Sequence, residues 1–144
     1  NLTGALASFR ASLDIRERLA KADPQNAGWQ RDLSVSHNKI GNVLVAQGNL
    51  TDALAAFRTS HDIFERLAKA DPQNAGWQRD LAISHFKTGL AEEQGGDIQA
   101  AIESFEAGRT VLAALVERMP DVVQWHQDLA DSERDLTRLR AARS

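Results

Sequence analysis

Two stretches of the chain have nearly the same sequence: NLTGALASFRASLDIRERLAKADPQNAGWQRDL (residues 1–33) and NLTDALAAFRTSHDIFERLAKADPQNAGWQRDL (residues 49–81). Over the full period, residues 1–48 match residues 49–96 at 33 of 48 positions. A third, more divergent copy keeps the frame without a gap, because three residues recur at the same spacing: Trp29, Trp77 and Trp125; Pro24, Pro72 and Pro120; Phe9, Phe57 and Phe105. A constant period of this size indicates stacked units that bury their apolar faces against one another.

Apolar residues within one copy follow helical spacing. From Leu50 to Ala68 they recur every three, four or seven residues, and from Trp29 to Leu44 they do so again. Each pattern places one apolar stripe on one face of a helix, and the alternation typical of strands is absent. The sequence therefore predicts an all-α protein of six helices, near residues 2–21, 26–46, 50–69, 74–94, 98–118 and 122–142.

Two kinds of junction separate the predicted helices. In Gln47-Gly48-Asn49, the glycine accepts the left-handed conformation that ends a helix, and the asparagine can cap the next helix. In Ala-Asp-Pro-Gln-Asn, the proline stops one helix and Asn26 or Asn74 caps the next. Because both junctions are short, successive helices are expected to run antiparallel. A plain helical bundle is the alternative, but a bundle has no reason to keep a constant period.

Composition argues against several classes of function. The net charge is -3, with 17 basic and 20 acidic residues in no long block of either sign, so we expect no nucleic-acid partner. Cysteine is absent, which excludes disulfides, thiol catalysis and cysteine-based zinc sites. No long apolar stretch or signal peptide is evident, so we expect no membrane partner and a cytoplasmic location. The chain opens with Asn inside a repeat, which indicates a piece of a longer protein.

Small and aromatic residues stand at fixed places in each copy: Gly41, Gly48, Ala53, Phe57 and Pro72, then Gly89, Gly96, Ala101, Phe105 and Pro120. This pattern resembles the tetratricopeptide repeat, a helix-turn-helix motif of about 34 residues. The copies here are longer, with seven added residues on either side of Pro72. Seven residues make about two helical turns, so equal insertions lengthen both helices of a hairpin and keep the apolar phase.

The resemblance implies a single domain, a right-handed α-solenoid of antiparallel helix hairpins. It would comprise a half repeat at 1–25, repeats at 26–73 and 74–121, and a terminal helix at 122–144. It also resembles long arrays in large bacterial proteins, which often carry a further sensing, protease-like or nucleotide-binding domain.

In this family the first helix of each repeat lines a concave groove that binds a peptide or a helix of a partner protein. The matching positions are Asn38, Lys39, Asn42, Val45, Phe86, Lys87, Leu90, Glu93, Arg134 and Arg138. Some members hold a peptide's terminal carboxylate with Lys and Asn on this face, but the full set is not reproduced here. Phe86 beside Leu90 is either an anchor for an apolar peptide side chain or a packing pair between helices. Residues 42–47 and 90–95 differ at six consecutive positions near this groove, through release from shared packing or through drift.

Other polar residues are expected to be structural. His37 and His85 lie one period apart without a third ligand, so we expect packing histidines and no metal site. Recurring Asp residues beside Arg or Gln, such as Asp128, predict salt bridges between repeats, because a catalytic group is normally unique. The recurring tryptophans are expected to fill the space opened by the added turns. Glu92 occupies a packing position and needs a partner or solvent, which suggests local loosening.

The leading hypothesis is a protein-protein interaction scaffold without enzymatic activity or cofactor. The alternative is a structural spacer or self-association module of a larger bacterial signalling protein. The uncovered first helix favours a homo-oligomer, since it carries an apolar row: Leu2, Leu6, Phe9 and Leu13. An enzyme would need a deep pocket with convergent polar groups, which these residues do not supply.

Overall fold

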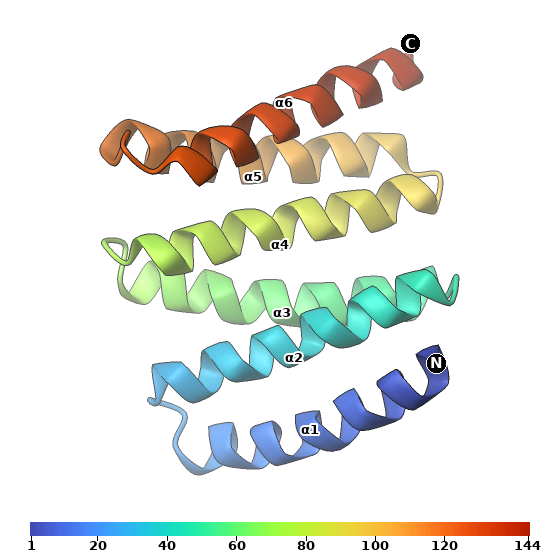
Figure 1. The fold of residues 1–144 in the computed structure, drawn as a ribbon, viewed down its shortest axis with the longest axis vertical. Coiled ribbons are helices and arrows are strands. Elements are labelled where there is room, and N and C mark those ends of the chain that lie inside the picture. Colours follow the sequence, from blue (N-terminus) through green and yellow to red (C-terminus); the bar gives the residue numbers. More distant parts are fainter. The chain divides into compact units, whose positions relative to one another are not determined.

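A computed structural model describes all of residues 1–144. They form six α-helices and no strand: α1 (Leu2–Ala22), α2 (Ala27–Ala46), α3 (Leu50–Ala70), α4 (Ala75–Gln94), α5 (Ile98–Arg118) and α6 (Val123–Arg143) (Figure 1). The prediction of an all-α protein with six helices is confirmed, and every observed boundary lies within one residue of the predicted one. None of the helices has both the length and the apolar character that a membrane span requires.

Asparagine caps explain why α2 and α4 begin one residue later than predicted. The side-chain Oδ1 of Asn26 accepts a hydrogen bond from the backbone N–H of Trp29 at 3.0 Å, and Asn74 accepts one from Trp77 at 3.1 Å. Each bond satisfies a donor that the first helical turn leaves without an intrahelical partner. The corresponding residue before α6 is Val122, which makes no side-chain cap. The third copy therefore lacks the side-chain cap at the start of this helix.

Glycines close α2 and α4 in the left-handed conformation. Gly48 has φ 79° and Gly96 has φ 86°, and no other residue of the chain has positive φ. The N–H of the residue after each glycine reaches back to a carbonyl in the last helical turn: Asn49 to Leu44 at 2.9 Å and Asp97 to Glu92 at 3.0 Å. This arrangement satisfies carbonyls that the helix end leaves open and reverses the chain at once.

The chain divides into two compact units, Asn1–Leu67 and Ala68–Ser144. In unit 1, α1 packs antiparallel on α2 (Figure 1). The first part of α3 also packs on α2, because a Cβ placed on Gly41 would lie only 2.3 Å from a ring carbon of Phe57. Only glycine lets the aromatic ring approach the helix backbone this closely.

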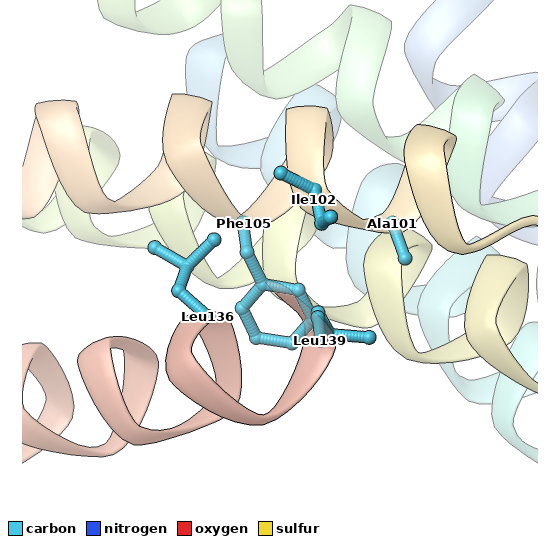
Figure 2. Packing of buried hydrophobic residues seen from close by; sticks show 5 residues of the cluster. All are labelled: Ala101, Ile102, Phe105, Leu136 and Leu139. Atoms are coloured by element: carbon cyan, nitrogen blue, oxygen red, sulfur yellow. The ribbon is translucent and has the colours of Figure 1, made fainter. Parts of the chain in front are cut away.

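In unit 2, α5 packs between α4 and α6. Figure 2 shows one core cluster, in which Phe105 extends from α5 toward Leu136 and Leu139 of α6. Ala101 and Ile102 of α5 complete the buried set of this cluster. A Cβ on Gly89 of α4 would lie 2.6 Å from the Phe105 ring, so the Gly and Phe contact of unit 1 recurs here.

A second core cluster occupies the lengthened part of unit 2. Leu112 and Leu115 of α5 are buried with Ala82 of α4, and Trp125 and Leu129 of α6 pack against them. The packing role expected for the tryptophan is confirmed for Trp125. Burial of such a large ring is a major source of apolar stabilisation.

A salt bridge between Arg79 and Asp128 joins the first helices of successive repeats within unit 2. The guanidinium of Arg79 on α4 lies 3.1 Å from the Asp128 carboxylate on α6, and the carboxylate side chain is only 12% exposed. Gln124 donates a further hydrogen bond to Asp128 at 2.9 Å. The sequence prediction that these recurring residues form salt bridges between repeats is confirmed for this pair.

Candidate peptide-binding surface

Four of the predicted groove residues lie on α2 in unit 1. Lys39 and Asn42 are exposed, whereas Asn38 and Val45 are half-buried. The Lys39 ammonium stands 5.9 Å from the centroid of the Phe9 ring on α1, which is a cation–π distance. Lys39 therefore covers the aromatic ring of the neighbouring helix. A peptide carboxylate would have to compete with this contact.

Asn38 is turned partly into the interior, because its side-chain Oδ1 is buried. It stands three residues before Gly41, the residue that receives the Phe57 ring. One helical turn separates the two positions, so both face the same neighbouring helix. In unit 1 the most accessible predicted polar groups are thus Lys39 and Asn42.

Phe86 of α4 is a packing residue, the second of the two alternatives considered for it. Its ring stacks on Phe105 of α5, with centroids 5.4 Å apart and an angle of 22° between the planes. A Cβ on Gly108 would lie 2.5 Å from the Phe86 ring, so the ring also occupies the space beside that glycine. The position faces α5, and Phe86 does not present an open aromatic anchor.

Leu90 and Arg138 are exposed residues of the predicted surface in unit 2, and Glu93 is half-buried. Leu90 on α4 is 44% exposed. The Glu93 carboxylate, one turn further along α4, accepts a hydrogen bond from the Arg138 guanidinium of α6. Arg138 also donates to Asp135 at 3.1 Å. The structure therefore brings together three predicted residues from two helices: an apolar side chain and an ion pair.

The electrostatics of this pair limit what it can bind. Hydrogen bonds to Glu93 and then to Asp135 raise the pKa of Arg138 above its ordinary value. The guanidinium stays charged at every accessible pH, but two carboxylates already compensate that charge. An acidic peptide group would have to displace Glu93, whereas an apolar group can cover Leu90 without breaking an ion pair.

The predicted residue Arg134 is exposed and pairs with Asp131 of the same helix, α6. A shallow depression of about 630 Å³ runs along this helix, lined by Ala130, Glu133, Arg134, Thr137 and Arg138. Thr137 stands where α4 has Gly89. Since Thr carries a Cβ, this face cannot receive an aromatic ring as α4 receives Phe105.

Two further charged residues of α4, Lys87 and Glu92, lie partly inside the packing. Lys87 is half-buried, and burial lowers the pKa of its ammonium group. Glu92, the acid at a packing position, accepts a hydrogen bond from the Ser104 hydroxyl of α5. The partner that the sequence analysis required for Glu92 is therefore present. Nothing in the sequence pointed to Ser104, because the two residues meet only when α4 and α5 pack.

Unit 1 contains a hollow that the sequence analysis did not anticipate. Its volume is about 480 Å³, and α1, α2 and α3 line it with Glu17, Ala20, Lys21, Pro24, Gln30, Leu33, His37, Thr59, Asp62, Ile63 and Arg66. Burial lowers the pKa of His37, and the nearby Glu17 carboxylate acts in the opposite direction. The hollow forms where α1 and α3 both border α2, a geometry that no local pattern reveals.

Two of the histidines have a contact that explains their position within their own unit. His61 lies 3.0 Å from Glu65 on the same helix, and the His126 ring lies 2.7 Å from the Pro120 carbonyl oxygen. No three His, Asp or Glu side chains are grouped so that they could hold a metal ion.

Comparison of the chain with models of known protein families and with curated proteins found no match.

Proposed function

We propose that the chain is a tetratricopeptide-like scaffold, a right-handed solenoid of helix hairpins whose first helices (α2, α4 and α6) bind a peptide or helix of a partner protein. The six helices, their constant period and the recurring Gly and Phe contact support this architecture. The observation that carries the binding role is the exposed Leu90 beside the Glu93 and Arg138 ion pair. An apolar anchor bordered by ionic groups is typical of a binding surface.

The proposed ligand presents an apolar side chain to Leu90. A polar or ionic group next to that side chain would meet Glu93 or Arg138 at the edge of the contact. The depression along α6 begins at Arg138 and offers room for the rest of the ligand. Rim charges of this kind select partners and orient them more than they add affinity.

Selection from a displayed library of short peptides tests this function. The affinity of a selected peptide is then measured for the chain and for a Leu90→Ala variant. We expect about a tenfold or greater loss with Leu90→Ala, because a central apolar contact contributes most of the affinity. Val123→Ala is the matched control, since Val123 is a second exposed apolar residue of unit 2 outside this surface. Equal losses in both variants, or no loss in either, would exclude Leu90 as the anchor.

The competing function is a spacer or self-association module. The exposed apolar residues of α1 favour it: Leu2, Ile15 and Leu19. A light-scattering concentration series separates self-association from binding of another protein, because a strict monomer at all concentrations would exclude self-association.

A further inference from the structure

Each unit has a hollow beside its Ala-Asp-Pro-Gln-Asn junction, and the two hollows occupy corresponding positions of the repeat. The hollow of unit 2 has a volume of about 280 Å³ and is lined by Pro72, Gln78, Val111, Ala114, Leu115 and Arg118. The first four of these residues lie one period after lining residues of the unit 1 hollow: Pro24, Gln30, Ile63 and Arg66. The hollow of unit 1, of about 480 Å³, is therefore a recurring feature of the repeat.

A glutamine builds the same wall in both hollows. The side-chain Nε2 of Gln30 donates a hydrogen bond to the Ala20 carbonyl oxygen at 3.4 Å, and Gln78 donates one to the Ala68 carbonyl oxygen at 3.1 Å. Each bond joins the start of one helix to the last turn of the helix before it. The wall beside the proline is therefore held by the same contact in the two units.

The two hollows differ in the group that completes them. In unit 2, the Arg118 guanidinium donates a hydrogen bond to the Pro72 carbonyl oxygen at 3.1 Å. In unit 1, the corresponding acceptor is the carbonyl oxygen of Pro24, but the position of Arg118 is taken by Ala70. Since alanine has no side-chain donor, the sequence supplies no guanidinium at this position of the first copy.

The charged residues around the unit 1 hollow differ in exposure. Glu17 is half-buried, and the other three are exposed: Lys21, Asp62 and Arg66. Solvent and salt screen exposed charges more strongly, so Glu17 contributes most to the electric field inside. Burial lowers the pKa of His37 and outweighs the opposing effect of Glu17, so this ring does not compensate the carboxylate at neutral pH. The interior of the hollow therefore favours a cation.

The apolar residues of the hollow suit the stem of a long side chain. Ala20 and Ile63 are each only 4% exposed, and Leu33 is half-buried. Long cationic side chains lay their methylene groups along apolar surface of this kind and keep the charged end near polar groups. A hollow of about 480 Å³ is also large enough for a ligand of the size of an amino acid.

We propose that the hollow of unit 1 binds the guanidinium group and methylene stem of an arginine that is not part of this chain. The ligand takes the place that the Arg118 side chain has in unit 2. The Pro24 carbonyl oxygen accepts a hydrogen bond from the guanidinium, and the Glu17 carboxylate compensates its charge. The site lies outside the Leu90 surface and does not depend on the proposed function.

Titration of the isotope-labelled full chain with L-arginine, followed by NMR, tests the proposal. We expect saturable shifts of the amide signals of Leu33 and His37, because both residues line the hollow. L-Citrulline, which has nearly the same shape and an uncharged side chain, should bind about tenfold more weakly. A Leu90→Ala chain should bind arginine as the parent chain does, so the two sites can fail independently.

Two substitutions at the hollow should change the affinity for arginine in opposite directions. Glu17→Gln should weaken binding by about tenfold, because it removes the half-buried carboxylate. Arg66→Ala should strengthen binding by about twofold, since it removes a screened cation from the same hollow. Glu117→Gln is the matched control: it removes one negative charge at an exposed position of unit 2 and should leave the affinity unchanged. Circular dichroism confirms that each variant keeps its helical content.

A Gly-Arg-Gly tripeptide with blocked ends distinguishes the two sources of the guanidinium group. Binding of this peptide at least as tightly as arginine would assign the hollow to an arginine of a partner chain. Binding of the free amino acid alone would assign it to a small molecule, and both results support recognition of a guanidinium.

Three results would overturn the proposal. The first is equal affinity for citrulline and arginine, and the second is no saturable binding of either guanidinium probe. The third is saturable binding of acetate that Arg66→Ala abolishes, which would assign the hollow to an anion.

Discussion

The α2–α3 pair of unit 1 and the α4–α5 pair of unit 2 use the same contact with different surroundings. In both pairs a glycine of the first helix receives a phenylalanine of the second: Gly41 with Phe57, and Gly89 with Phe105. One turn away, unit 1 has Asn38 and Ser60, where unit 2 has Phe86 and Gly108. The Asn38 Oδ1 and Ser60 Oγ atoms are buried, whereas Phe86 stacks on Phe105.

The difference shows which part of the repeat is fixed and which part can be exchanged. The aromatic ring needs the bare backbone of glycine, so the Gly and Phe pair is kept in both units. The neighbouring position tolerates either a small polar pair or a large ring facing glycine, because interiors conserve volume more strictly than chemistry. Of the two alternatives that the sequence left open for Phe86, the structure shows the packing one, with the ring stacked on Phe105 and next to Gly108.

The largest expected effect is the difference in stability between removing the buried Phe105 and removing its half-buried counterpart Phe9. Phe105→Ala should lower the free energy of unfolding by about 4 kcal/mol, because the ring is buried and leaves a cavity. Phe9→Ala should cost less than half as much, since Phe9 is half-buried and water can fill part of the space. Urea unfolding followed by circular dichroism measures both. Equal losses would mean that α1 is as well packed as α5.

A smaller loss of stability is expected when the contact between Phe86 and Gly108 is disturbed. Gly108→Ala should lower the free energy of unfolding by about 2 kcal/mol, because the new Cβ meets both the Phe86 ring and the Ala82 carbonyl oxygen. Gly76→Ala is the matched control: its Cβ meets only the Asn74 side chain, at 3.4 Å.

Adding Phe86→Asn to a Gly108→Ser chain recreates the pair found in unit 1. The loss in the double variant should be smaller than the sum of the two single losses, since the two positions share one space. Strict additivity would show that the two positions pack independently, and the comparison between the units would fail.

The smallest expected effect is the dependence of stability on pH that the half-buried His37 of unit 1 causes. Burial lowers the pKa of His37 below its ordinary value of 6.5, so the unfolded chain binds this proton more readily than the folded chain. The stability that comes from keeping the ring neutral is fully present above pH 6.5 and is lost as the pH falls below it. His37→Gln should flatten this part of the stability profile, measured by thermal unfolding at several pH values. His126→Gln, at an exposed position, is the control, and an unchanged slope in His37→Gln would contradict the assignment.

Much of the fold could be predicted because its determinants are local or repeat at a fixed period. Helical spacing and the Asn, Pro and Gly punctuation placed all six helices to within one residue. The salt bridge between Arg79 and Asp128 was also foreseeable, because both residues recur one repeat apart. The surroundings of the candidate site depend on contacts between helices. Glu93 of α4 pairs with Arg138 of α6, the Phe86 ring stacks on Phe105 of α5, and the Lys39 ammonium lies over the Phe9 ring.

The sequence by itself determined the number of helices, their ends and the apolar stripe on each, since these depend on spacing and on residues that stop or cap a helix. Only the tertiary structure decided which side chains those stripes leave open. The contacts of Glu92 with Ser104, the ion pair of Glu93 with Arg138 and the hollow around His37 all join residues from different helices. Their existence depends on how the helices pack, and the pattern along a single helix carries no information about its neighbour's side chains.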